Sequence, residues 1–207
     1  MRATLIHQGP VELDLDDLRR RLVSPGAAAT IEGDPGAGRP SASKPASVLV
    51  PVVAREAGLT VLFTRRTAHL RAHSGQISFP GGRAEPVDAD VESTALRETR
   101  EEIGLEREQV CIFGRLPEYH TRTGYRVTPV VGLLRPPFKL VPDAHEVDEV
   151  FEVPLSFLLD PGNHQRHTRE FEGRTITYYA MPWGGYYIWG ATAGMLVNLD
   201  RQLVAAR

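Results

Sequence analysis

Cysteine is nearly absent from this chain, with a single example among 207 residues. One cysteine excludes an intramolecular disulfide and any C-x-x-C zinc or redox pair. Cys111 lies in the apolar run at residues 110–113, which predicts a small buried core residue rather than a nucleophile.

Long apolar runs and a strong excess of one charge are missing as well. No stretch approaches about 18 consecutive apolar residues, so we expect no membrane-spanning helix. Residues 1–10 lack the apolar segment of a signal peptide, which favours the cytoplasm. The formal net charge of −2 argues against a dedicated nucleic-acid binder, which would carry a strongly basic balance or face.

The remaining composition is that of an ordinary globular protein, with 42% hydrophobic and 24% charged residues. A chain of this length buries roughly 70% of the surface that its unfolded form exposes, so the core needs no disulfide or structural metal. We expect two parts. Residues 1–46 hold a helix over 11–23 and a linker rich in Gly, Pro and Ala, and residues 47–207 form one folded domain.

Strand-like and helix-like segments alternate through residues 47–207. Helices are predicted over 90–103, where Gly104 is the stop, over 154–159 and over 191–204. Strands are predicted over 48–54, 59–64, 76–79, 110–116, 125–134, 149–153, 170–172 and 175–181. Strands interrupted by helices predict an α+β or α/β class with a mixed sheet.

The helix predicted over 90–103 is the most informative segment. Glu98, Glu101 and Glu102 stand three and four residues apart, so all three project to one side of it. Their mutual repulsion costs roughly a few tenths of a kcal/mol per pair, which Arg97 offsets in part by pairing with Glu101. A solvated charged face is one interpretation. The other is a site for Mg²⁺ or Mn²⁺, hard cations that take oxygen ligands.

Two glycines ahead of the helix favour the metal site. Gly81 and Gly82 follow a predicted strand, and glycines there let the backbone turn tightly and bring its carbonyls close to an ion. With the helix they resemble the signature of Nudix hydrolases, G-x5-E-x7-R-E-U-x-E-E-x-G-U, where U is a bulky aliphatic residue. The matching residues are Gly82, Arg97, Glu98, Glu101, Glu102, Gly104 and Leu105.

The chain departs from this signature at two points. Thr99 stands where a bulky aliphatic residue is expected. The spacing from Gly82 to Arg97 is one residue longer than in the signature, so Asp88 matches the middle acid out of strict register. We expect Asp88 to cap the start of the helix rather than to bind metal.

A second motif lies just before the glycines. Residues 62–82 resemble the extra signature of the coenzyme A pyrophosphatase branch of Nudix hydrolases, L-L-T-x-R-[SA]-x3-R-x3-G-x3-F-P-G-G. Phe63 replaces a leucine, and Thr67 replaces serine or alanine. The resemblance covers residues 47–200. Residues in register are Thr64, Arg66, Arg71, Gly75, Phe79, Pro80, Gly81 and Gly82.

This resemblance implies a Nudix fold, an α/β/α sandwich with a mixed sheet between helices. It also implies metal-dependent hydrolysis of the pyrophosphate bond of coenzyme A or a derivative, giving 3′,5′-ADP and 4′-phosphopantetheine. Arg66 and Arg71, with Gly81 and Gly82, are the implied substrate-binding residues, since guanidinium groups bind phosphate bidentately.

The resemblance also implies roles for the helix residues. Glu98 and Glu102 are expected to bind Mg²⁺ or Mn²⁺ directly, and Glu101 is expected to be either a third ligand or a group that contacts the ligands. The Gly82 carbonyl would complete the site, and Arg97 orients a glutamate. The catalytic set is then Glu98, Glu101, Glu102 and Arg97. A helix glutamate, Glu146 or Glu149 are all candidates for the general base, which must lie within hydrogen-bond reach of the attacking water.

Two alternative functions stay open. One is a Nudix pyrophosphatase for ADP-ribose or NADH, and the other is a non-catalytic Nudix-fold regulator, which would be expected to lose helix carboxylates.

Three roles are open for the aromatic residues of the C-terminal third: stacking on substrate, packing in the core, or forming a homodimer surface. They are Tyr178, Tyr179, Trp183, Tyr186, Tyr187 and Trp189.

Overall fold

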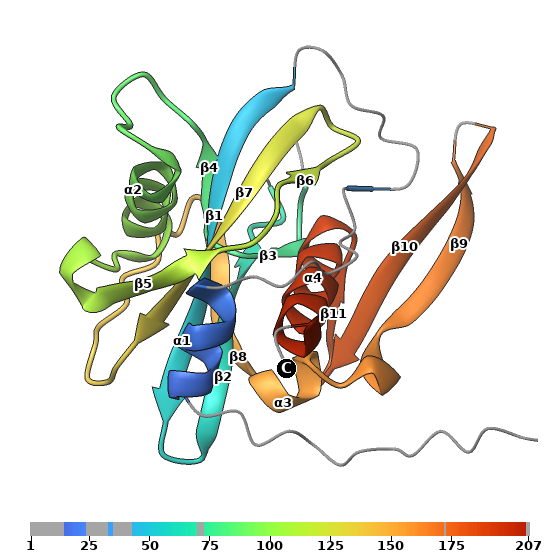
Figure 1. Ribbon diagram of the computed structural model, residues 1–207. Helices are drawn as coiled ribbons and strands as arrows, with labels where there is room; N and C mark the ends of the chain where they lie inside the picture. Colours follow the sequence, from blue (N-terminus) through green and yellow to red (C-terminus); the bar gives the residue numbers. More distant parts are fainter. Residues whose placement is uncertain (1–14, 24–32, 35–42, 70–72, 172, 206–207) are drawn as a thin grey trace, which may run out of the picture.

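The computed structural model describes residues 15–23, 33–34, 43–69, 73–171 and 173–205. Within these ranges an eight-stranded sheet forms the centre of the molecule (Figure 1). Its main path runs β3-β2-β1-β7-β5, and β4, β6 and β8 pair with β1, β7 and β2. The strands are β1 (Lys44–Arg55), β2 (Gly58–Arg66), β3 (Ile77–Ser78), β4 (Gly81–Arg83), β5 (Val110–Arg115), β6 (Tyr119–His120), β7 (Tyr125–Leu134) and β8 (Val147–Pro154).

Strand β1 lies in the middle of the sheet and pairs with three other strands. It pairs antiparallel with β2, where Arg55 lies opposite Gly58, which confirms the predicted hairpin. It pairs parallel with β7 and antiparallel with β4, where Ser47 lies opposite Gly82. The sheet is therefore mixed, as predicted.

Helices cover both faces of the sheet. They are α1 (Leu15–Val23), α2 (Val91–Ile103), α3 (Leu155–Leu158) and α4 (Ala191–Ala205), with the short helices η1 (Arg107–Gln109) and η2 (Pro161–Asn163). Successive strand residues point to opposite faces. On β2, Leu62 packs in the apolar cluster that contains residues of α2, while Val61 and Phe63 pack in the cluster that contains α1 and α4. The expected α/β/α sandwich is confirmed, with α2 and α4 on opposite sides of the strands (Figure 1).

The N-terminal part contributes to this core. Leu18 and Leu22 of α1 are buried, and the helix contacts β5 and α4. Residues 11–14 of the predicted helix and most of the predicted linker lie outside the described residues. Within that linker, Asp34 accepts a hydrogen bond from the Tyr119 hydroxyl at 3.0 Å. Strand β1 begins at Lys44, three residues before the expected start of the domain.

A second sheet joins β9 (Gln165–Phe171), β10 (Arg174–Trp183) and β11 (Tyr186–Trp189). The β9–β10 hairpin extends away from the body of the molecule (Figure 1). The predicted hairpin around Gly173 is confirmed but is longer than expected, and β11 was not predicted. Tyr186 ties this sheet to the main one, because its ring stacks on Phe151 with centroids 3.7 Å apart.

One prediction for the core is wrong: Cys111 is exposed. It lies on β5 at the end of the main strand path, where Phe113 is the buried residue instead.

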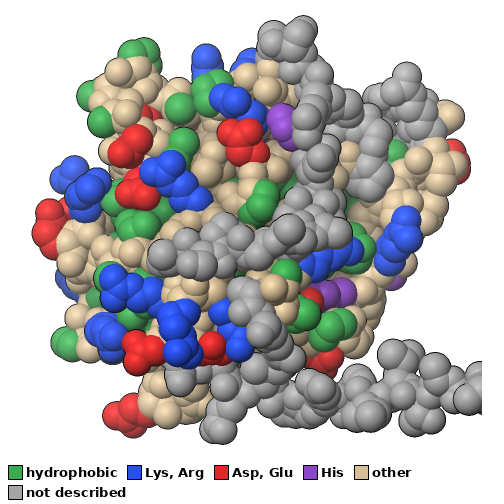
Figure 2. Space-filling model, in the orientation of Figure 1, with side chains coloured by type: hydrophobic (Ala, Val, Ile, Leu, Met, Phe, Trp, Pro, Cys, Tyr) green, Lys and Arg blue, Asp and Glu red, His purple; other side chains and the backbone are tan. Residues whose placement is uncertain are grey.

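The visible surface mixes both signs of charge. Figure 2 shows Lys and Arg interspersed with Asp and Glu on one face. In the described ranges, no helix is long and apolar enough to cross a membrane.

Candidate active site

Helix α2 has a defined start and stop. Asp90 is its N-cap and accepts a hydrogen bond from the Ser93 amide at 2.7 Å. Gly104 ends it in the left-handed conformation, with φ of 68°, which glycine adopts at little cost. The prediction that Asp88 caps the helix is therefore wrong. The side chains of Thr99 and Ile103 are buried in the core, and Glu102 is buried as well, on the side of the helix that faces β4.

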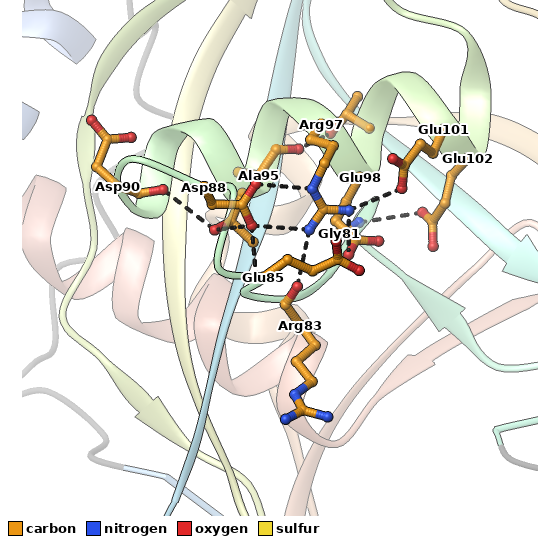
Figure 3. A network of polar contacts seen from close by, with 12 residues as sticks. Gly81, Arg83, Glu85, Asp88, Asp90, Ala95, Arg97, Glu98, Glu101 and Glu102 are labelled. Carbon is orange, nitrogen blue, oxygen red and sulfur yellow. Dashed lines mark hydrogen bonds and ion pairs between the residues drawn. The ribbon is translucent and has the colours of Figure 1, made fainter.

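Strand β4 brings the two glycines against that glutamate side. The Gly81 amide donates to Glu102 Oε2 at 3.2 Å. A Cβ on Gly82 would lie only 2.5 Å from Glu98 Oε2, so the carboxylate occupies the space that glycine leaves free. Gly81 has no room either, because a Cβ there would clash with the backbone of Ser47. Glu98 and Glu102 thus converge on Gly81 and Gly82. Figure 3 shows both glutamate side chains on the side of the helix that faces Gly81.

Glu101 takes a different position from the other two glutamates. Its side chain is 59% exposed, compared with 18% for Glu98 and 5% for Glu102. It accepts a hydrogen bond from Arg97 Nη1 at 2.9 Å. The structure therefore brings two of the three predicted carboxylates together at the glycines. Among the described residues, no three acidic, histidine or cysteine side chains are already arranged as a ligand set for a metal.

Arg97 links most of the polar groups around the helix (Figure 3). Its Nη1 lies 3.0 Å from Glu98 Oε1. Its Nε and Nη2 donate to the two oxygens of Asp88 at 2.9 and 3.0 Å, and Nη2 also donates to the Arg83 carbonyl at 3.0 Å. These contacts hold Arg97 beside the carboxylates.

Asp88 has contacts beside the site that the sequence analysis did not predict. Besides the paired bonds from Arg97, it accepts hydrogen bonds from the Glu85 amide at 2.8 Å and the Thr94 hydroxyl at 3.0 Å. These donors, Arg97 first, hold the pKa of the Asp88 carboxyl well below its usual range. The Nudix spacing did place an acid at this position, but only the folded loop shows that its partner is Arg97.

Burial changes the acid–base chemistry of the two converging glutamates. Burial raises the pKa of the Glu102 carboxyl to about 8, and the charges of Glu146 and Glu98 add to the rise. The Gly81 amide and Arg66 act in the opposite direction. Burial also raises the pKa of Glu98, against the lowering effect of Arg97. Both carboxylates lack the solvation that stabilises charge, so an incoming cation would stabilise them strongly.

The predicted arginines differ in what surrounds them. Arg66 Nη1 lies 3.6 Å from Glu102 Oε1, at the edge of the glutamate pair. Arg65 instead pairs with Asp148 at 2.8 Å and Glu149 at 3.0 Å. Arg71 lies outside the described residues. Arg66 is thus the described arginine of the upstream motif that adjoins the carboxylates.

The two candidate bases outside the helix are in different surroundings. Glu149 accepts a hydrogen bond from the Tyr186 hydroxyl at 2.6 Å and pairs with Arg65. Glu146 is exposed, and its charge raises the pKa of both Glu98 and Glu102. Of these two acids, Glu146 is the one whose charge acts on both converging glutamates.

The donor set fits a hard divalent cation. It comprises the carboxylate oxygens of Glu98 and Glu102 beside a glycine backbone, with Arg66 next to it for a phosphate. Mg²⁺ in enzymes is commonly bound by one or two carboxylates plus substrate phosphates. The absence of a Cβ at Gly82 is what allows the Glu98 carboxylate to approach the strand.

Comparison with known proteins gives consistent family matches. Residues 43–176 match the NUDIX domain family. The chain is 39% identical over 158 residues to the "Uncharacterized Nudix hydrolase NudL" of Photorhabdus laumondii subsp. laumondii, covering 76% of this chain and 84% of that protein. The protein of the same name from Escherichia coli O157:H7 is 39% identical over 159 residues, covering 76% and 82%.

Solved structures resemble part of the chain. The Nudix hydrolase RenU from M. smegmatis is 24% identical with a TM-score of 0.48, covering 57% of this chain and 74% of that one. A C. elegans Ap4A hydrolase binary complex is 23% identical with a TM-score of 0.45, covering 54% and 80%. The family assignment rests on the sequence matches.

Proposed function

Since this chain belongs to the Nudix hydrolase family, we propose that it hydrolyses the pyrophosphate bond of coenzyme A or a close derivative. One observation carries the proposal: Glu98 and Glu102 converge on Gly81 and Gly82, and Arg66 of the upstream motif lies 3.6 Å from Glu102. A pyrophosphate needs both a cation site and a guanidinium group beside it, because its oxygens carry several negative charges.

In this proposal each residue of the site has a separate role. Mg²⁺ or Mn²⁺, when bound, would neutralise phosphate charge and acidify the attacking water. Glu98 and Glu102 would hold the ion, and the Gly82 carbonyl would complete the site. Arg97, fixed by Asp88, orients Glu98. Arg66 binds a phosphate oxygen in place of its contact with Glu102.

The proposed reaction is a simple hydrolysis. The oxygen of a water molecule bonds to one phosphorus, and the bond from that phosphorus to the bridging oxygen breaks. The bridging oxygen leaves with the second phosphate, and a carboxylate accepts the proton of the water. Coenzyme A would give 3′,5′-ADP and 4′-phosphopantetheine.

The test compares coenzyme A with ADP-ribose and NADH, each with Mg²⁺ or Mn²⁺, and follows the products by chromatography. We expect 3′,5′-ADP from coenzyme A and slower cleavage of the other two. Glu102→Gln should lower the rate at least about 100-fold, because even outer partners of a metal site contribute about 10–100-fold. The matched control is Glu108→Gln, an exposed acid beyond the helix.

Two other outcomes of the substrate test would change the proposal. Faster cleavage of ADP-ribose or NADH would reject coenzyme A as substrate while keeping the hydrolase. Folded, metal-supplied protein that cleaves none of the three would favour the ligand-binding regulator.

A further inference from the structure

Residues 141–146 belong to the connection from β7 to β8, and they are hydrogen-bonded to the C-terminal end of α2, the helix that carries the glutamates. The Val141 amide donates to the Ile103 carbonyl at 2.8 Å. The Asp143 amide donates to the Glu102 carbonyl at 2.9 Å. The loop is therefore tied to the backbone of Glu102 by a direct hydrogen bond.

The loop also closes on itself through Asp143. The carbonyl of Asp143 accepts hydrogen bonds from the Glu146 amide at 3.0 Å and the Val147 amide at 2.8 Å. Its carboxylate accepts from the His145 amide at 2.9 Å. These contacts form a compact turn that ends at Glu146.

Thr67 holds the far side of the turn. It follows Arg66 at the end of β2, and only 5% of it is exposed. Its amide donates to the Glu146 carbonyl at 3.0 Å, and its hydroxyl donates to the His145 carbonyl at 2.9 Å. The last paired residues of β2 and β8 are Arg66 and Val147, so the Thr67 contacts extend the attachment past the sheet.

We infer that Thr67 is a positioning residue, whose hydroxyl and amide fix the turn so that Glu146 stands beside Glu98 and Glu102 and accepts the proton of the attacking water. This inference rests on the proposed function and deepens it. The exposure of Glu146 leaves its carboxylate accessible to water, whereas Glu149 is occupied by Tyr186 and Arg65. The turn that carries Glu146 is hydrogen-bonded to the Glu102 carbonyl on one side and to Thr67, the residue after Arg66, on the other.

Substitutions at Thr67 separate the hydroxyl from the rest of the side chain. Valine has nearly the same shape and keeps the amide, but it leaves the His145 carbonyl without its donor. Serine keeps the hydroxyl. Alanine, which the related signature accepts at this position, removes the hydroxyl without adding bulk and serves if the valine variant does not fold.

The experiment measures kcat and KM for coenzyme A with Mg²⁺ in the full chain. We expect Thr67→Val and Thr67→Ala to lower kcat about tenfold with little change in KM, a loss that corresponds to one hydrogen bond. Thr67→Ser should keep the wild-type kcat. Glu146→Gln should lower kcat further, and adding Thr67→Val to it should lower kcat no more, because both changes act through one group.

A second measurement does not depend on activity or metal. Amide hydrogen exchange at residues 143–147 of the metal-free protein should become faster in Thr67→Val and stay unchanged in Thr67→Ser. Multiplied losses in the double variant, or a higher KM with kcat kept, would overturn the inference while leaving the proposed function intact. Absence of hydrolysis by the wild-type protein would overturn both.

Discussion

At the scale of single residues, the site depends on the absence of side chains at Gly81 and Gly82 as much as on the carboxylates that lie against them. Gly81 and Gly82 are adjacent, yet a side chain would meet different obstacles at each. At Gly82 the obstacle is the end of the flexible Glu98 side chain, whereas at Gly81 it is the backbone of β1. The two positions therefore separate an effect on chemistry from an effect on folding.

We predict that Gly82→Ala lowers kcat about 100-fold while the free energy of unfolding changes little. The new Cβ, 2.5 Å from Glu98 Oε2, would push the carboxylate out of place, and a misplacement of about 1 Å typically has an effect of that size. Gly81→Ala should instead lower the melting temperature, because the β1 backbone cannot yield. Steady-state kinetics and thermal denaturation of both variants provide the check. Full activity in Gly82→Ala would show that the position of Glu98 is unimportant.

Asp88 gives a prediction that depends on pH. Its folded-state pKa is depressed by the Arg97 guanidinium, so the ion pair stabilises the folded protein above the unfolded value of 3.8. That contribution decreases as the pH falls below 3.8 toward the folded-state pKa. Asp88→Asn should therefore reduce the free energy of unfolding by about 2 kcal/mol at pH 7, and the difference from wild type should shrink at pH 3.

Urea denaturation at both pH values measures this difference. Glu56→Gln, in the exposed turn between β1 and β2, is the control and should cost little stability at pH 7. A difference between Asp88→Asn and wild type that stays constant from pH 7 to pH 3 would mean that the Asp88–Arg97 pair does not stabilise the fold.

At the scale of elements, helix α1 is short, and it precedes the strand that starts the sheet. Isolated helices of nine residues are not stable in water, so α1 must gain its stability from packing. Its Leu18 side chain is fully buried within the same apolar cluster as α4. The helix is thus held by the core that it helps to form.

We predict that Leu18→Ala reduces the free energy of unfolding by about 2–5 kcal/mol, the usual range for a buried leucine. Arg20→Ala, on the same helix but 74% exposed, should change it by less than about 1 kcal/mol. Chemical denaturation of the two variants tests the contrast. Equal stabilities would mean that α1 does not contribute to the stability of the folded domain.

The sequence predicted elements with strong local signals well. Strand β7 spans residues 125–134 as expected, and α2 starts one residue after its predicted start because Asp90 is the cap. The three-residue β4 and the four-residue β11 escaped prediction, since their stability comes from pairing with β1 and β10. Short strands carry too few side chains for an alternating pattern to show.

The sequence predicted which residues form the site, but not how their side chains are arranged in space. Spacing put Glu98, Glu101 and Glu102 on one side of the helix, and the prediction left open whether Glu101 is a third ligand or contacts the ligands. The sheet distinguishes them, because β4 approaches the side of α2 where Glu98 and Glu102 lie and leaves Glu101 to Arg97 and solvent. Distances between segments cannot be obtained from the order of residues along one helix.

At the scale of the whole molecule, stacked aromatic rings join the sheet core to the C-terminal sheet. Phe79 stacks on Phe63 at 5.2 Å, Phe63 on Phe151 at 5.7 Å, and Phe151 on Tyr186 at 3.7 Å. The series starts next to the two glycines and ends at the residue that holds Glu149. The C-terminal aromatics thus include one that packs in this series beside the site.

The loop between β4 and α2 is anchored at both ends and closed in the middle. The Ala84 amide donates to the Pro45 carbonyl at 3.0 Å, the Asp88 amide donates to the Glu85 carbonyl at 3.0 Å, and Asp90 caps the helix. An extra residue between these anchors changes the contour of the loop without shifting the glycines or the helix. Evolution can therefore lengthen this segment while the chemistry stays in place, and family members should be recognised by their anchors rather than by a fixed count of intervening positions.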